Sequence, residues 1–198
     1  MKIRAILAGA SGGTTSTATV ELACQLATLF EAHLECHHVR MDPRDFVVAA
    51  SAGDFGLALD GGWLDQLETE AQAAADRTKG KVLEIIKRRG IPMLDAPSKS
   101  PASAAWRVDK GYANVLIPRR ARFFDLTVLG RSDRVVKEAY TDVIEQTLLH
   151  SGRPVLLAQP TRLGRAGGGR SIRTTLTPST SPHFKGIDNA HAVPGVVA

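Results

Sequence analysis

The sequence predicts an α/β domain with an open, doubly wound parallel sheet that has helices on both of its faces. Two short apolar runs, at 126–129 and 155–158, are joined by a stretch in which apolar residues recur at helical spacing. Strands joined through a helix lie parallel, and parallel sheets are covered by helices on both faces. The start of the chain has the same organisation, because an apolar run at 3–8 leads into a glycine loop, a helix and a second apolar run at 33–39.

The first half of the chain supplies two helices beside these opening strands. Apolar residues over 20–30 predict a helix with a wide apolar face. The segment 41–62 is rich in Pro, Asp and Gly, so we expect an irregular excursion there. Over 63–89 apolar residues recur three and four positions apart, which predicts a long helix. Two arginines and Gly90 mark its end.

The second half supplies the rest of the sheet. Short apolar pieces at 91–93 and 105–108 are separated by a proline-containing stretch, and we expect the second piece to be the third strand. A helix over 112–121 leads to the strand at 126, and the last helix ends at the Ser151-Gly152 pair. The prediction is therefore five strands in the doubly wound order 3-2-1-4-5, with four helices.

The composition changes after residue 160. Residues 161–198 contain three consecutive glycines, a run rich in Ser, Thr and Pro, and few periodic apolar residues. Such a segment buries too little surface to offset its ordering entropy, so we expect a folded domain at 1–160 and a disordered basic tail at 161–198. The tail holds five Lys and Arg residues and a single Asp, so most of the net charge of +5 lies there. The domain itself is close to neutral, which argues against nucleic acid as a partner.

Other classes of protein are also disfavoured. No apolar run approaches the roughly 20 residues that a membrane span needs, so we expect no membrane partner. The amino terminus has a basic start and a short apolar run that breaks into a glycine loop. We therefore expect a strand there rather than a signal peptide, and a cytoplasmic protein. Cys24 and Cys36 form neither a CxxC pair nor a disulfide framework, which agrees with a reducing compartment.

Three segments carry a family resemblance. They are Trp106-Arg107-Val108, the run DLTVLGR over 125–131 and the run SGRPVLL over 151–157. Together with the first strand they resemble a universal stress protein domain, and the resemblance covers roughly residues 1–160. It implies a non-enzymatic stress-response or signalling module that forms a homodimer through its last strand, here Val155 to Ala158. Some family members carry a second copy of the domain after this point, so a truncated tandem protein is one explanation of the tail.

Ligands of doubly wound sheets bind beyond the carboxyl ends of the strands, where the two halves of the sheet separate. For the order 3-2-1-4-5 that crevice lies between strands one and four. Two glycine loops meet there, each followed by a helix amino terminus that can receive a phosphate group. Glycine in these loops is explained about equally well by tight turns. The candidate ligand-binding residues are Ala10, Ser11, Gly12, Gly13, Val39, Gly130, Arg131 and Ser132.

The resemblance adds Thr141 to this set and also reveals departures from a nucleotide site. Nucleotide-binding universal stress proteins place an Asp where this chain has Ser11. They also carry a GxxG pair followed later by Gly-Ser/Thr, which cradles the phosphates. Gly130 matches, but Asp133 stands at the second glycine and Thr141-Asp142 replaces the later pair. Two carboxylates would repel phosphate by about 1 kcal/mol or more per close pair, so we expect ATP to bind weakly or not at all.

Two interpretations of function stay open. The first is a non-enzymatic module with a degenerate nucleotide site, and the alternative is an ATP-binding universal stress protein or a nucleotide-dependent hydrolase of the same fold. Neither GxGxxG nor GxxxxGK[ST] occurs in the sequence. The run Cys36-His37-His38 is interpreted as buried packing, because alternation along a strand leaves at most two ligands on one face. No catalytic or metal-ligating residue is assigned, and Arg119-Arg120 is interpreted as a solvated helix end.

Overall fold

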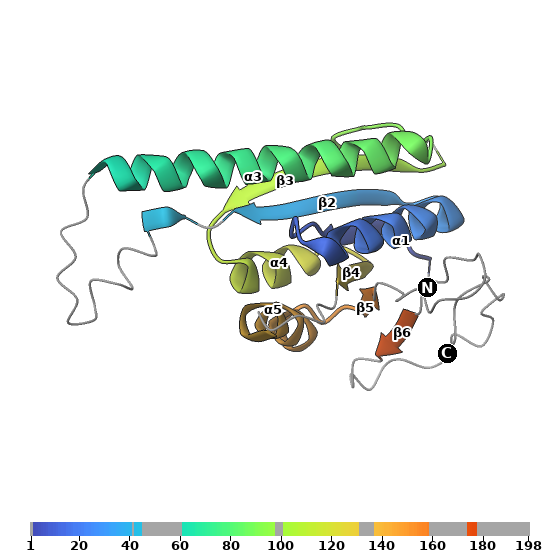
Figure 1. The fold of residues 1–198 in the computed structure, drawn as a ribbon. Coiled ribbons are helices and arrows are strands. Elements are labelled where there is room, and N and C mark those ends of the chain that lie inside the picture. Colours follow the sequence, from blue (N-terminus) through green and yellow to red (C-terminus); the bar gives the residue numbers. More distant parts are fainter. Residues whose placement is uncertain are drawn as a thin grey trace, which may run out of the picture.

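The computed structural model of the chain describes residues 2–40, 42–44, 61–97, 101–130, 137–158 and 174–177. Figure 1 shows a layered α/β fold in which a twisted sheet lies between helices. The elements, in chain order, are β1 (Ala5–Gly9), α1 (Thr14–Phe30), β2 (His33–Arg40), α3 (Gly61–Arg88), β3 (Ser103–Lys110), α4 (Ala113–Ala121), β4 (Leu126–Gly130), α5 (Lys137–His150), β5 (Val155–Ala158) and β6 (Thr174–Thr177).

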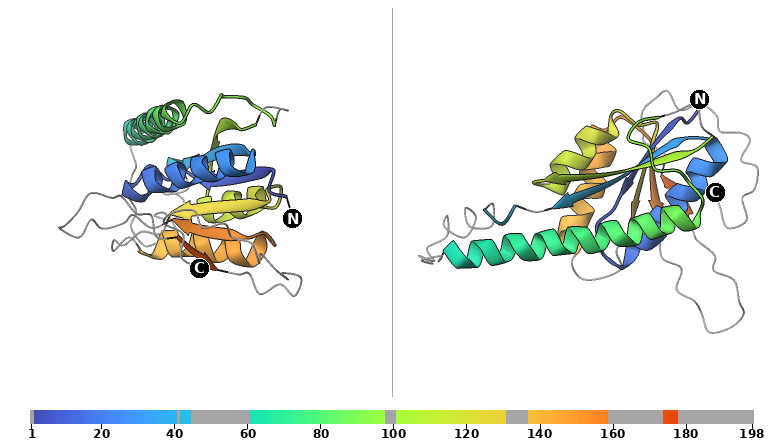
Figure 2. Two further views of the ribbon diagram at one scale, coloured as in Figure 1. Left: turned by 90° about the vertical axis from the view of Figure 1, so that its right-hand side faces the viewer. Right: turned by 90° about the horizontal axis from the view of Figure 1, so that it is seen from above.

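The predicted sheet topology is confirmed. β1 pairs in parallel with β2 on one side and with β4 on the other, while β3 extends the sheet beyond β2 and β5 extends it beyond β4. The resulting order, β3-β2-β1-β4-β5, is that of a doubly wound sheet. Helices α1 and α3 lie on one face, and α4 and α5 lie on the other (Figure 2). The direction in which the chain winds reverses between β1 and β4, as expected.

The sheet also contains a sixth strand that the sequence analysis did not anticipate. β6 pairs antiparallel with β5, with Leu156 opposite Leu176, and it comes from the segment expected to be disordered. The rest of 159–198 lies outside the described residues, so the expectation of a disordered tail stays a prediction. The pairing itself has a physical reason, because three of the four residues of β6 are threonines, which favour strands, and the edge of β5 offers unpaired backbone groups.

The bounds of several elements differ slightly from those predicted. β1 begins at Ala5 rather than at residue 3, and β3 covers 103–110 rather than 105–108. The piece at 91–93 contributes only an isolated bridge, between Met93 and Ala104. Helix α3 ends where expected, and Gly90 follows it in the left-handed conformation at φ 68°, which a residue without a Cβ adopts most readily. Most of the excursion predicted at 41–62 lies outside the described residues.

Two hydrophobic clusters hold the layers together. Successive residues of β1 point to opposite faces, so Ile6 belongs to the cluster under α1 and α3 and Leu7 belongs to the cluster under α4 and α5. Both side chains are fully buried, as expected for a strand at the centre of a parallel sheet. Among the described residues, no helix is both long and apolar enough to cross a lipid bilayer.

Candidate functional site

A cavity of about 220 Å³ opens at the carboxyl ends of β1 and β4, beside the amino-terminal part of α4 and the middle of α5. This is the place where a doubly wound sheet binds its ligands, because the chain winds away in opposite directions on either side. Most of the lining is apolar. The residues that line the cavity are Gly9, Ala10, Ser11, His37, Val39, Ala113, Ile117, Leu129, Gly130, Val143 and Ile144.

The structure brings together some of the sequence-predicted site residues but not all of them. Ala10, Ser11, Val39 and Gly130 all line the cavity. Gly12 and Gly13 instead line a separate narrow recess of about 10 Å³ between α1 and α3, together with Thr78 and others. Arg131 and Ser132 lie outside the described residues, and Thr141 lies within α5 but its side chain is not described. Ligand binding by any of these residues stays a prediction.

The loop after β1 is anchored from two sides. The backbone N–H of Ala10 donates to the carbonyl of His37 at 2.8 Å, and Nδ1 of His38 donates to the carbonyl of Ala10 at 2.6 Å. Gly12 has a φ of 80°, and a Cβ there would lie 2.6 Å from Oγ1 of Thr78. Only glycine fits this conformation and this approach to α3. The glycine at this position is therefore explained by the geometry of the loop.

Gly130 allows the end of β4 to approach α1 closely. A Cβ at this position would lie 2.6 Å from Oγ1 of Thr19 and 3.0 Å from Oγ1 of Thr15. Real Cβ atoms do not approach their neighbours so closely, and both threonines are buried. Helix–strand packing thus requires this glycine whether or not a phosphate binds beside it.

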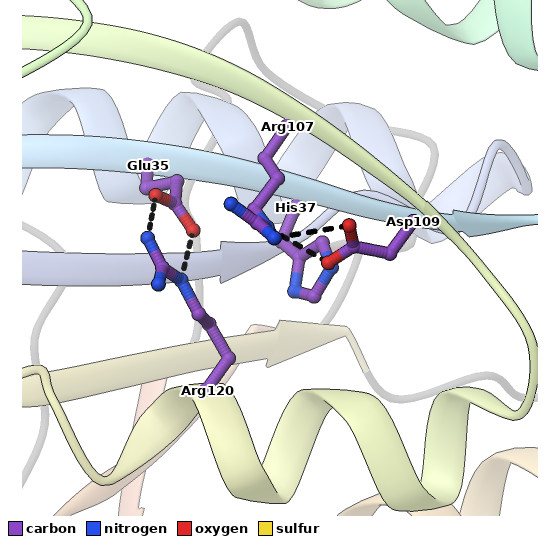
Figure 3. A network of polar contacts seen from close by, with 5 residues as sticks. All are labelled: Glu35, His37, Arg107, Asp109 and Arg120. Atoms are coloured by element: carbon purple, nitrogen blue, oxygen red, sulfur yellow. Dashed lines mark hydrogen bonds and ion pairs between the residues drawn. The ribbon is translucent and has the colours of Figure 1, made fainter.

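A polar network lies on the face of β2 that points toward α4 (Figure 3). Glu35 and His37 share this face because they are two residues apart on the strand. The parallel register places Arg107 of β3 beside His37, and Asp109 follows two residues later on the same face. Arg120 reaches the network from α4. Five charged or titratable side chains from three elements therefore meet here.

His37 connects this network to the cavity. Its ring is 1% exposed, and Nε2 lies 3.0 Å from Oδ2 of Asp109. Arg107 holds the same carboxylate with two hydrogen bonds, Nε to Oδ2 at 2.7 Å and Nη2 to Oδ1 at 3.1 Å. The other ring nitrogen, Nδ1, is buried and has no hydrogen-bond partner in the described part of the chain.

Burial decides the protonation of this histidine. It lowers the pKa of His37 below the ordinary value of 6.5, and this effect outweighs the opposing charges of Asp109 and Glu35. Burial alone would raise the pKa of Asp109, but the hydrogen bonds and charge of Arg107 and the contact with His37 together lower it. The pair is thus a neutral imidazole that donates Nε2–H to an ionised carboxylate, with the proton absent from Nδ1.

Glu35 and Arg120 tie β2 to α4 over a long sequence separation. The guanidinium of Arg120 donates from Nε to Oε1 at 2.8 Å and from Nη2 to Oε2 at 2.6 Å, a bidentate arrangement. The Glu35 side chain is only 9% exposed. Arg120 also lies over the Phe124 ring, 5.5 Å from its centroid. The interpretation of Arg119-Arg120 as a solvated helix end is therefore wrong for Arg120, because it pairs with a buried carboxylate.

Asp142 lies close to the cavity. Its carboxylate accepts a hydrogen bond from Nδ2 of Asn114, which links the beginning of α4 to α5. The neighbour of Asn114 in the chain, Ala113, lines the cavity, and so does Val143, the neighbour of Asp142. Asp142 is thus next in the chain to a lining residue but is not itself among the described lining residues, and its position near a bound phosphate stays a prediction.

The neighbouring residues Cys36 and His38 face away from the cavity, as strand alternation predicts. Cys36 is buried in the cluster under α1 and α3, and the His38 ring stacks on Trp106 at a centroid distance of 5.9 Å. Both cysteines are free, and burial raises the pKa of Cys24 to about 12, so its thiol stays protonated. The ranges that the structure describes contain no group of three or more potential metal ligands.

Acidification should destabilise the fold through its buried histidines. Burial also lowers the pKa of His33, so the unfolded chain takes up protons on His33 and His37 below pH 6.5 while the folded chain does not. The stability that they contribute is complete above pH 6.5 and is lost as the pH falls toward the folded-state values. We expect a lower free energy of unfolding in urea at about pH 5.5 than at about pH 7.5. Replacing both histidines by Phe should shrink this difference in the free energy of unfolding. An unchanged difference would show that His33 and His37 do not cause the loss of stability at low pH.

Comparison with known proteins bears on the fold. No protein-family model matches the chain, and no curated protein matches it. Among solved structures, the universal stress protein UspA from Lactobacillus plantarum is similar, with a TM-score of 0.58 and 15% identity over 79% of this chain and 98% of that one. The hypothetical protein MJ0577 has a TM-score of 0.59 and 14% identity over 81% and 99% of the two chains. The hypothetical protein PH0823 has a TM-score of 0.52 and 15% identity over the same shares. The described part of the chain therefore has the fold of the universal stress proteins.

Proposed function

We propose that this protein is a universal stress protein that acts by binding rather than by catalysis, with a nucleotide-type cavity that disfavours phosphate groups. The supporting observation is the cavity itself, which lies at the carboxyl ends of β1 and β4 and includes four of the residues that the sequence singled out. Its apolar walls suit the base and sugar of a nucleoside better than a chain of phosphates.

The charges around the cavity support weak binding of phosphates. Asp142 is next in the chain to the lining residue Val143, and in the sequence it occupies a position where the family pattern has a small residue next to the phosphates. Asp133 occupies the position of a phosphate-binding glycine in the sequence, although it lies outside the described residues. Each carboxylate close to a phosphate costs about 1 kcal/mol or more in a partly dry site.

The types of residue that line the cavity also favour a role without catalysis. Of the residues that line the cavity in the described ranges, His37 is the only one with a titratable side chain. Phosphoryl transfer relies on cations that neutralise the developing charge, and no Lys or Arg is among these lining residues. The alternative, an ATP-binding or ATP-hydrolysing protein, keeps one supporting feature, since α1 begins directly after the glycine loop and can offer its amino terminus to an anion.

Calorimetry with ATP and magnesium tests this proposal. We expect a dissociation constant in the millimolar range or weaker, which corresponds to no more than about 4 kcal/mol of binding free energy. We also expect no phosphate release above that of a sample without protein. Binding in the micromolar range, or measurable turnover, would contradict the proposal and favour the nucleotide-dependent alternative.

Homodimerisation through β5 is a further part of the proposal, and β6 bears on it. The outer edge of β5 pairs with β6 of the same chain, so a second copy must displace β6 to pair there. A chain that ends at residue 160 should therefore dimerise more strongly in analytical ultracentrifugation than the full chain. A chain that ends at residue 180, which keeps β6, is the matched control and should behave like the full chain. Equal, purely monomeric behaviour of all three would exclude β5 as the interface.

A further inference from the structure

One buried atom of a residue in the cavity wall has no hydrogen-bond partner among the described residues. Among the described residues, Nδ1 of His37 and Oγ1 of Thr127 are the buried side-chain nitrogen and oxygen atoms without a hydrogen-bond partner. Buried polar atoms in folded proteins are nearly always satisfied, so each exception calls for a reason. Of these two residues, only His37 lines the cavity.

The network on β2 and β3 determines what this atom can do. Asp109 is fixed as an acceptor by Arg107, so the ring proton resides on Nε2 and points to the carboxylate. Nδ1 then carries a lone pair and can only accept a hydrogen bond. Figure 3 shows the imidazole extending from β2 toward α4, which contributes two of the residues that line the cavity. The histidine is thus oriented as an acceptor by its neighbours.

The rest of the wall, as far as the structure describes it, does not supply the missing donor. Apart from Ser11, whose residue is exposed, the other lining side chains are apolar or are glycines. The nearby backbone N–H of Ala10 already donates to the carbonyl of His37. A ligand that enters the cavity can supply an N–H or O–H group to Nδ1. At about 220 Å³, the cavity is smaller than the roughly 300–1,000 Å³ of typical ligand pockets, so it takes one part of a ligand.

We propose that the cavity binds an uncharged ligand of the nucleoside class, and that His37 selects it by accepting a hydrogen bond from its N–H or O–H group at Nδ1. An anion is disfavoured because Nδ1 presents a lone pair and has no proton to donate to it. A metal ion is disfavoured because the described lining residues include no carboxylate to join the histidine. The inference rests on the proposed function, since it assigns the ligand class and the selecting residue of the same cavity.

Adenosine is the probe that tests this inference, because it offers N–H and O–H donors without phosphate. The decisive variant is His37→Phe, which keeps a planar ring but removes the acceptor. The matched control is His33→Phe, because His33 is buried on the same face of the same strand but bonds to Oγ of Ser103 at 2.8 Å, away from the cavity lining. We expect His37→Phe to weaken adenosine binding in calorimetry by about tenfold to a hundredfold, and the control to bind like the unaltered chain.

A second measurement uses the unaltered chain and needs no variant to fold. In nitrogen-15 NMR, Nδ1 of His37 should be unprotonated in the free protein, and its resonance should shift as adenosine is added. Equal binding by His37→Phe, a protonated Nδ1 in the free protein, or no shift up to about 10 mM adenosine (a binding free energy below about 3 kcal/mol) would each overturn the inference. Failure of the proposed function is separate, because it would appear as tight ATP binding or turnover.

Discussion

Replacing Arg120 by alanine should lower the free energy of unfolding by about 2–3 kcal/mol, because the buried carboxylate of Glu35 would lose its bidentate partner. Removing one partner of a fully buried pair costs about 3–5 kcal/mol, and the lower value here reflects the 34% exposure of the Arg120 side chain. The change is measured by urea denaturation at neutral pH. The loss of stability is large because the Glu35 carboxylate remains buried without its partner, and not only because a contact is lost.

Two controls separate this effect from a general loss of positive charge or of helix packing. Arg119→Ala removes an exposed arginine next to Arg120 in the same helix and should change stability by no more than about 0.5 kcal/mol. Adding Glu35→Gln to Arg120→Ala removes the stranded charge and should recover about half of the loss. If Arg119→Ala costs as much as Arg120→Ala, the ion pair with Glu35 is not what stabilises the junction of β2 and α4.

The fold could be predicted because its signals are local. The bounds predicted for β5 agree with the structure, since Val155–Ala158 is a continuous apolar run between turn residues. Bounds were less accurate at β3, where Arg107 and Asp109 interrupt the apolar pattern to form the network. β6 was missed because four strand-forming residues stand in a segment whose overall composition indicates disorder. These residues pair with β5 because β5 has a free sheet edge, and the composition of the segment gives no information about that edge.

The site was predictable only in part, for a related reason. Chain topology alone brings Ala10, Val39 and Gly130 together, because the ends of neighbouring parallel strands meet at one edge. Strand alternation could also have found His37, which shares a face with Val39 two residues later. Its partner Asp109 could not be found in this way, since their meeting depends on the register between β2 and β3, which are joined by a long connection containing α3.

The glycines of the two loops carry less functional information than the sequence suggested. Gly12 is explained by its positive φ and its approach to Thr78, and Gly130 by its approach to Thr15 and Thr19. Both are needed for the loops and the packing even in a protein that binds no phosphate. Evidence on the ligand must therefore come from the side chains around the cavity, chiefly His37 and Asp142.

Restoring the family pattern should create or strengthen ATP binding. The variant combines Asp133→Gly and Asp142→Ser, which remove the two carboxylates, with Ser11→Asp, which supplies an acceptor at the cavity for the adenosine. Two repulsions of about 1 kcal/mol each correspond to a gain in affinity of roughly tenfold or more, since about 1.4 kcal/mol is one decade. Calorimetry with magnesium and ATP on the unaltered and the altered protein measures this gain.

Asp142→Ser alone is the part of this prediction that the described residues support most directly, because Asp142 bonds to Asn114 and a chain neighbour of each, Val143 and Ala113, lines the cavity. Its matched control is Glu145→Ser, which removes the same charge from an exposed position one turn later in α5. We expect Asp142→Ser to tighten ATP binding about fivefold and Glu145→Ser to change it less than twofold, because water and salt screen an exposed charge more strongly than a part-buried one. Equal effects of the two would mean that the net charge of the domain, rather than a carboxylate at the cavity, keeps phosphate away.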